Sequence, residues 1–174
     1  LNFSLCVLLS FSHYIYSSCD RAEDASRVTI AGGSLTEIVY LLGQENKLVA
    51  VDITSNYPKE AKELPSIGYV RALSAEGVLS LSPTLILGED DTGPAAVMEQ
   101  LSRVGIQIEI IPEENTTNGI IRKVKCVAEI LGVNSITKDK TLNDLNADAR
   151  ELRLLTERNK KEPPRVMFIL SMES

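Results

Sequence analysis

Short apolar runs of high β propensity alternate with helical segments along most of this chain, and that alternation most constrains its fold. Parallel strands need long crossover connections, which helices supply, so the pattern predicts an α/β protein with a Rossmann-like parallel sheet covered on both faces. Ligands of such sheets bind at the loops beyond the carboxyl ends of the strands. The predicted strands are residues 27–31, 47–51, 83–87 and 107–111, and the predicted helices are residues 34–42, 58–64, 74–81, 94–104 and 117–131.

The turn after the first predicted strand carries Gly32 and Gly33, followed by Ser34 and Glu37. The S-x-x-E spacing predicts a capping box, in which each side chain accepts a hydrogen bond from a free backbone N–H at the start of the helix. Paired glycines between a strand and a helix also occur in phosphate-binding loops. The run A-G-G-S-L-T lacks the G-x-G-x-x-G spacing, so nucleotide binding is the disfavoured interpretation.

The first nineteen residues contain no charged side chain. An apolar stretch followed by small polar residues predicts a secretory signal peptide, and the polar interruptions argue against the alternative of a transmembrane anchor. Cys19 is also a candidate for the lipid-bearing cysteine of a bacterial lipoprotein. With Cys6 and Cys19 assigned to the export region, Cys126 is the only thiol of the mature body, so a buried, unpaired Cys126 and no disulfide are expected.

The charge of the chain argues against one class of partner. There are 24 acidic and 18 basic residues, a net charge of −6, and a surface that follows phosphates needs a basic excess, so we expect no nucleic-acid partner. The only histidine, His13, lies in the export region, which excludes a Ser-His-Asp triad or a histidine metal site from the mature part. The acids Glu89, Asp90 and Asp91 are more typical of a solvated turn than of a cation site.

From residue 135 onward the pattern predicts one long, charged, amphipathic helix that Pro163 and Pro164 end. Residues 165–170 then predict a fresh apolar strand. Because a lone apolar strand would be an aggregation-prone edge, we expect it to open a second lobe that is otherwise absent. The predicted organisation is a signal peptide over residues 1–19, an N-terminal α/β lobe over 27–134, a connector helix over 135–162, and the first strand of a truncated second lobe over 165–174.

The strongest candidate for chemistry is the loop Ile67-Gly68-Tyr69-Val70-Arg71, which lies where the topology of the sheet would place a cleft. It places a phenol two residues from a permanent cation, and a nearby guanidinium stabilises a phenolate. Phenolate is a hard anionic ligand suited to ferric iron, as in tyrosine-ligated haem. The alternative is a packed ring whose hydroxyl is hydrogen-bonded.

Three segments carry a resemblance to a known family: IAGGSLTEIVYLLG, LVAVDITSNYP and LPSIGYVRALSAEGVLSLSPTLILGEDDTGP. Over residues 27–132 the chain resembles the N-terminal lobe of the haem (hemin) substrate-binding proteins of bacterial ABC importers. The G-Y-x-R-x-L-S-x-E-G segment is the specific part, and the long helix is similar to the family's connector. The resemblance implies a bilobal, helix-linked periplasmic binding protein of the class III type.

The resemblance also implies roles for single residues. Tyr69 would be the axial ligand of the haem iron, and Arg71 would support the ligated haem electrostatically. Glu76 would dock on an arginine pocket of the permease, while a carboxylate that stabilises a helix N-terminus is its structural alternative. The remaining pocket residues implied by analogy lie in two loops: Thr54, Ser55 and Tyr57 in the first, and Asp91, Thr92 and Gly93 in the second.

The function implied is that of a non-enzymatic, periplasmic protein that captures haem and delivers it to an ABC permease. Haem would be a transported ligand and not a catalytic cofactor, and an outer-membrane haem receptor would be an indirect partner. A binding protein for cobalamin or a ferric siderophore is the closer alternative. An intracellular α/β enzyme that uses the Gly32-Gly33 turn for a phosphate is the more distant one.

Overall fold

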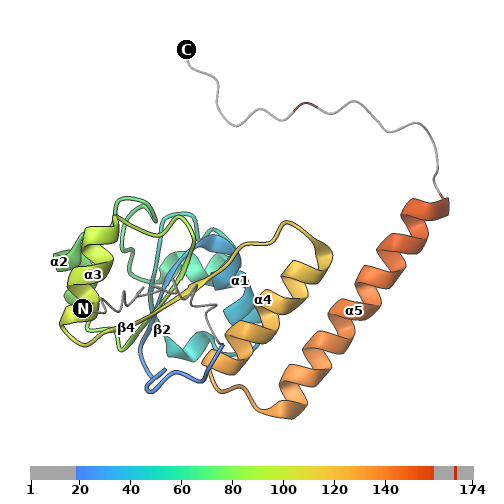
Figure 1. Cartoon of the computed structure of the whole chain (residues 1–174), viewed down its shortest axis with the longest axis horizontal. Coiled ribbons are helices and arrows are strands. Elements are labelled where there is room, and N and C mark those ends of the chain that lie inside the picture. The colour runs from blue at the N-terminus through green and yellow to red at the C-terminus, as the bar shows by residue number, and fades with distance from the viewer. Residues whose placement is uncertain (1–18, 159–166, 168–174) are drawn as a thin grey trace, which may run out of the picture.

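The computed structural model describes residues 19–158 and residue 167 and contains a four-stranded sheet with helices on both faces (Figure 1). Every strand pair is parallel, in the order β2-β1-β3-β4, which confirms the predicted parallel sheet. The strands are β1 (Val28–Ala31), β2 (Leu48–Val51), β3 (Leu85–Glu89) and β4 (Gln107–Ile111). The α-helices are α1 (Gly33–Leu41), α2 (Ala75–Leu79), α3 (Ala95–Arg103), α4 (Thr117–Ile130) and α5 (Ser135–Arg158).

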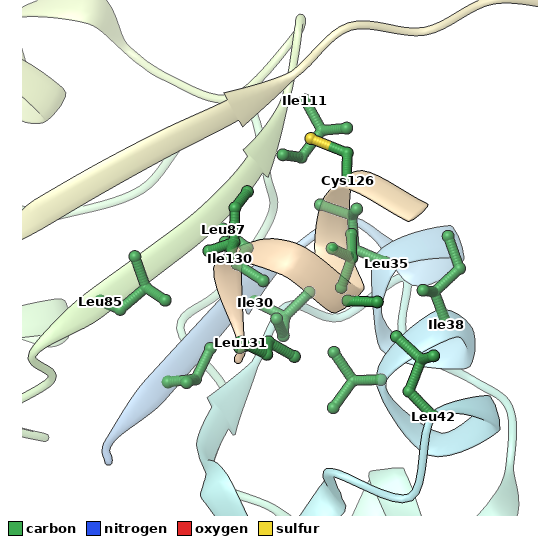
Figure 2. Close-up of a cluster of buried hydrophobic side chains, with 14 of the residues drawn as sticks. Ile30, Leu35, Ile38, Leu42, Leu85, Leu87, Ile111, Cys126, Ile130 and Leu131 are labelled. Carbon is green, nitrogen blue, oxygen red and sulfur yellow. The ribbon is translucent and has the colours of Figure 1, made fainter. Parts of the chain in front are cut away.

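Alternate side chains of the strands face opposite layers because a strand has a period of two. In β3, Leu85 and Leu87 join the buried cluster formed with α1 and α4, whereas Ile86 joins the cluster formed with α2 and α3. Figure 2 shows the first cluster, in which Ile30 and Leu87 of the sheet meet the buried side chains of α1 and α4. These two apolar layers hold the strand ends, and the loops that follow them, in fixed positions.

The start of α1 differs from the predicted capping box. Gly32 is the N-cap residue with a φ of 140°, and no side chain caps the helix there. A Cβ on Gly32 would come within 2.7 Å of Glu89 Oε2, and a Cβ on Gly33 would come within 2.8 Å of the Thr54 carbonyl oxygen. The close approach of neighbouring loops therefore requires glycine at both positions. With Gly32 as the N-cap, Ser34 lies inside the first turn of α1 and does not cap the helix, and its hydroxyl donates to Glu89 instead.

The predicted helix over residues 58–64 is a short 3₁₀ turn, Lys59–Glu63. The other predicted helices and strands of the lobe agree with the structure to within about two residues at each end. The predicted connector helix over residues 135–162 begins as expected at Ser135 and is described as far as Arg158. The predicted strand over residues 165–170 and the predicted signal peptide lie outside the described residues, except for Met167 and Cys19.

Helix α5 lies alongside α4 (Figure 1). Leu142 and Leu145 pack against the cluster beneath α4, yet no residue of α5 is itself buried. Leu152 and Leu155 farther along the helix are 64% and 51% exposed. Within residues 19–158 no helix is long and apolar enough to cross a membrane.

The expectation that the mature body contains no disulfide is wrong. Cys19 and Cys126 are joined by a disulfide across 107 positions of sequence, with their Cα atoms 5.0 Å apart. Cys126 is buried in α4, as expected, but its sulfur is bonded rather than free. The error arose because Cys19 was assigned to the export region and was therefore not considered as a partner.

Candidate functional site

The candidate residues gather at the carboxyl edge of the sheet, where the loops after all four strands meet. A buried carboxylate, Asp52, ties two of these loops together directly after β2. It accepts hydrogen bonds from the backbone N–H groups of Gly32 and Thr54, both at 3.1 Å, and from the hydroxyls of Thr54 and Ser55 at 2.7 and 2.9 Å. Four donors compensate the desolvation of this charge, so Asp52 fixes the turn after β1 against the loop after β2.

We call residues 66–73 the tyrosine loop. The chain enters it beside the end of β2, where the Val51 N–H donates to the Pro65 carbonyl and the Ile67 N–H donates to the Val51 carbonyl, both at 3.0 Å. Ile67 and Val70 are buried on either side of Tyr69, which is 41% exposed. The local sequence therefore anchors the loop by its apolar residues and leaves the phenol ring at the surface.

The loop after β3 holds the tyrosine loop from the other side. The Gly93 N–H donates to the Val70 carbonyl, and the Leu73 N–H donates to the Gly93 carbonyl, both at 3.0 Å. On the opposite flank the Ile53 N–H donates to the Gly68 carbonyl at 2.9 Å. Backbone hydrogen bonds thus clamp the tyrosine loop between two neighbouring loops.

Arg71 and Asp91, both predicted as site residues, form an ion pair of 2.8 Å between Nε and Oδ2. The hydrogen bond to Asp91 raises the pKa of Arg71, with further contributions from the nearby Tyr69 and from the charge of Asp91. The pair is 63% and 40% exposed, so it adds little to stability but restricts the orientation of the guanidinium. Among the described residues, the Tyr69 hydroxyl has no hydrogen-bond partner, so it is available to a ligand.

The other predicted pocket residues divide into exposed and buried groups. Tyr57 is 66% exposed, whereas Ser55 is 4% exposed and bonds through its hydroxyl to Asp52 and Thr36. Thr92 accepts a hydrogen bond of 2.9 Å from the Glu89 N–H and closes the turn after β3. Ser55 and Thr92, like the buried Gly93, therefore shape the loops that carry the exposed side chains.

A pocket of about 810 Å³ opens beside this edge, between α1, α4 and α5. Thr54 and Tyr57 belong to its lining, whereas Tyr69, Arg71 and Asp91 do not. The loop 53–57 consequently has two sides, one facing the pocket and one hydrogen-bonded to the tyrosine loop. The structure brings the predicted residues to one edge of the sheet but into two adjacent zones.

A buried ion pair that the sequence reasoning missed borders the pocket. Lys123 of α4 and Glu89 at the end of β3 lie 2.5 Å apart, with side chains 10% and 13% exposed. The Lys123 ammonium also contacts Glu113 at 3.3 Å and donates to Ser34 at 2.8 Å, and the Ser34 hydroxyl donates to Glu89. The only sequence signals were a lysine in the buried half of an amphipathic helix and an acid at a strand end.

The three consecutive acids Glu89, Asp90 and Asp91, the first of which ends β3, bind three different partners. Glu89 pairs with Lys123, Asp91 pairs with Arg71, and Asp90 accepts a hydrogen bond of 3.0 Å from the Glu113 N–H. Their carboxylates thus serve three separate partners rather than one solvated turn. In the part of the chain that the structure describes, no group of three or more His, Cys, Asp or Glu side chains could hold a metal ion.

Glu76 lies apart from these zones in the first turn of α2. The N-cap is Ser74, whose hydroxyl accepts a hydrogen bond of 3.0 Å from the Gly77 N–H. Because Ser74 already caps the helix, Glu76 is not needed as a cap, and its side chain is exposed to solvent. Its place in the first turn fits the alternative of a carboxylate that stabilises the helix N-terminus, and its exposure fits the predicted surface role.

Solved structures with the same lobe include two haem-binding proteins. A periplasmic haem-binding protein of Pseudomonas aeruginosa is 36% identical, with a TM-score of 0.70 over 79% of this chain and 50% of its own. The periplasmic haem-binding protein RhuT of Roseiflexus sp. RS-1 is 33% identical, with a TM-score of 0.74 over 80% of this chain and 53% of its own.

The curated relatives include vitamin B12-binding proteins. A vitamin B12-binding protein of Photorhabdus laumondii is 31% identical over 125 residues, which is 72% of this chain and 43% of that protein. This chain thus spans about half the length of the relatives that it matches. A family model described as periplasmic binding protein matches residues 28–174. Because this match covers most of the chain, the protein belongs to the periplasmic binding protein family.

Proposed function

We propose that the full-length protein captures haem in the periplasm and delivers it to an ABC permease, without catalysing a reaction. The observation that carries the proposal is the clamped tyrosine loop, which presents the Tyr69 hydroxyl at the carboxyl edge of the sheet beside Arg71. A phenolate oxygen suits ferric iron, and a guanidinium suits an anionic haem. The haem-binding relatives support the assignment.

The cleft that encloses the haem would need a second wall. Porphyrin-sized ligands bury most of their surface in apolar pockets, whereas Tyr69 and Arg71 lie on one lobe and are open to solvent. This chain spans about half of its relatives, so the opposing wall would come from a second lobe beyond α5. Thr54, Tyr57 and Asp91 would then line the near wall beside the iron ligand.

Cobalamin is the second candidate ligand, because a vitamin B12-binding protein is among the relatives. The cobalt of cobalamin already has its axial ligands. An exposed phenol beside a cation would therefore add no bond to the metal. The Tyr69–Arg71 arrangement therefore favours haem over cobalamin, and likewise over a ferric siderophore whose iron is already fully ligated.

A titration of the full-length protein with hemin and, separately, with cyanocobalamin tests the proposal. We expect hemin to bind and to give the visible absorption of ferric haem with an oxygen axial ligand, and cyanocobalamin to bind at least tenfold more weakly, a difference of about 1.4 kcal/mol. Tighter binding of cyanocobalamin, or of a ferric siderophore added as competitor, would overturn the assignment.

For delivery, we propose that Glu76 contacts a basic pocket of the permease. Exchange of Glu76 for lysine is expected to reduce ATP-dependent haem uptake into proteoliposomes at least tenfold, while hemin affinity stays within about twofold. The physical reason is that a charge reversal at an interface replaces an attraction with a repulsion, without touching the ligand site.

The matched control for Glu76 is Glu60→Lys, which reverses an exposed charge in the first turn of another short helical element. Haem uptake with the Glu60→Lys variant should equal that with the unmodified protein. If Glu76 only stabilises the N-terminus of α2, the Glu76→Lys variant will support normal haem uptake. Its free energy of unfolding will be lower by about 0.3–1 kcal/mol. That result would remove the docking role.

The periplasmic location follows the family and its relatives. Haem would reach this compartment through an outer-membrane receptor, which makes that receptor an indirect partner. A lipid anchor through Cys19 would require the sulfur that forms the disulfide with Cys126 in the structure.

A further inference from the structure

The first described residues of the chain are bound to the body of the lobe at its α4 side. Cys19 and Cys126 form a disulfide, and both side chains lie in or against the main buried cluster. Cys126 is 5% exposed and lies in the middle of α4, so its sulfur faces the interior rather than solvent. A partner must therefore come to it from a segment that packs on the same layer, and residues 19–25 do so. We call residues 19–25 the N-terminal strap.

The strap is held by more than its sulfur. Ala22 is 7% exposed, and its N–H donates to the Ile130 carbonyl at the end of α4 at 2.9 Å. The Glu23 N–H donates to the Gln107 side chain at the start of β4 at 2.9 Å. The Arg21 guanidinium lies over Gly132, where an added Cβ would come within 2.8 Å of Arg21 Nε. The strap is thus an integral part of the folded lobe. A segment that is cleaved off during export could not fill this place.

One sulfur atom can serve only one of the two fates considered for Cys19. The lipid of a bacterial lipoprotein is attached through a thioether to the sulfur of the cysteine that becomes the first residue. In the structure that sulfur is bonded to the sulfur of Cys126. A lipidated Cys19 would leave Cys126 as an unpaired thiol in the core. The lipid and the disulfide are therefore mutually exclusive states of the same residue.

We propose that Cys19 is retained in the mature protein as the disulfide partner of Cys126 and is not a lipid attachment site. The two thiols lose two protons and two electrons as the S–S bond forms, and a disulfide oxidant of the export compartment, a thiol–disulfide oxidoreductase or a small-molecule disulfide, takes them up and becomes a dithiol. Cleavage of the leader then falls on the amino-terminal side of Cys19. The haem assignment is not needed for this inference.

Peptide mapping of the full-length protein, expressed with its own leader and purified from the export compartment, tests the proposal. The sample is alkylated before and after reduction. We expect a peptide containing Cys19 to be linked to the peptide containing Cys126, and neither cysteine to react before reduction. A diacylglyceryl mass on Cys19, a mature chain that begins after Cys19, a Cys6–Cys126 link, or free thiols at both positions would each overturn it.

Fractionation of two variants gives an independent readout. Cys19→Ser should remain in the soluble periplasmic fraction like the unmodified protein, and Cys126→Ala should make Cys19 reactive to alkylation without reduction. A shift of the protein from the membrane fraction to the soluble fraction on Cys19→Ser would show that Cys19 was the anchor and would overturn the proposal. Because peptide mapping uses the unmodified chain, a variant that fails to fold leaves the test intact.

Reduction also gives a thermal signature. The disulfide closes a loop of about 107 residues, so its loss restores conformational freedom to the unfolded chain. We expect dithiothreitol to lower the melting temperature of the unfolding transition of this lobe by roughly 5–15 °C in the unmodified protein and to leave that of Cys19→Ser unchanged. Equal responses of the two proteins to the reductant would contradict the pairing of Cys19.

Discussion

Hemin binding by the full-length protein is expected to weaken roughly 100-fold or more when Tyr69 is replaced by phenylalanine. Phenylalanine keeps the ring and its packing but removes the only oxygen that position 69 offers to iron. Loss of a group that merely supports a metal ligand already costs 10–100-fold in affinity, and loss of the ligand itself should cost at least as much. Titration followed by visible absorption measures both the affinity and the identity of the axial ligand.

The control for Tyr69 is Tyr57→Phe, which removes the hydroxyl of the more exposed tyrosine on the adjacent loop. Because Tyr57 would line the near wall without binding the iron, we expect that variant to keep the absorption spectrum of the unmodified protein, with affinity changed by less than about threefold, roughly 0.7 kcal/mol. If Tyr69 is only a packed ring, phenylalanine will replace it without a change in spectrum or affinity. If Tyr57 is the ligand instead, Tyr57→Phe will weaken hemin binding and change the spectrum, and Tyr69→Phe will not.

The second large effect is expected at the buried ion pair. Lys123→Met should lower the free energy of unfolding of this lobe by about 3–5 kcal/mol, because it leaves the Glu89 carboxylate buried without its cation. The substitution keeps the length and the apolar part of the side chain, so packing in α4 changes little. Urea unfolding, followed by circular dichroism, measures the loss.

Two further variants separate the lost charge from general damage to α4. Lys125→Met removes an exposed lysine of the same helix, which lies 4.0 Å from Glu129, and should change stability by less than about 0.5 kcal/mol. Adding Glu89→Gln to Lys123→Met should recover a large part of the loss, because the unpaired charge is then gone. Equal losses for Lys123→Met and Lys125→Met would show that the Lys123–Glu89 pair contributes no more to the free energy of unfolding than an exposed pair does.

The alternation of strands and helices could be predicted because it depends on local apolar periodicity. Most element boundaries follow from that pattern, and the site loops follow from the rule that parallel strands place their carboxyl ends together. The position of Tyr69 at that edge was predicted on the same ground. Its clamping by Gly93 was not, because backbone hydrogen bonds between loops leave no mark in the side-chain sequence. The strand order β2-β1-β3-β4 was not predicted either, because alternation alone does not say which strands are neighbours.

The failures share a physical cause, which is contact between residues far apart in the chain. Ser34 was expected to cap its own helix, but Glu89, which lies 55 positions away, accepts its hydroxyl instead. Asp52 and Lys123 were not singled out, since their partners come from other strands, helices and loops and meet them only in the folded lobe. Cys126 was expected to be unpaired because the presumed end of the leader separated it from Cys19.

The backbone hydrogen bonds that hold the tyrosine loop bear on how the ligand selectivity of such a lobe could diverge. The hydrogen bonds through Gly68, Val70, Leu73 and Gly93 involve backbone atoms only, so none of them depends on the identity of residue 69 or 71. Either side chain can be exchanged while the main chain keeps its course. Under the proposed function, single substitutions at these two exposed positions would change ligand selectivity at little cost to the stability of the fold.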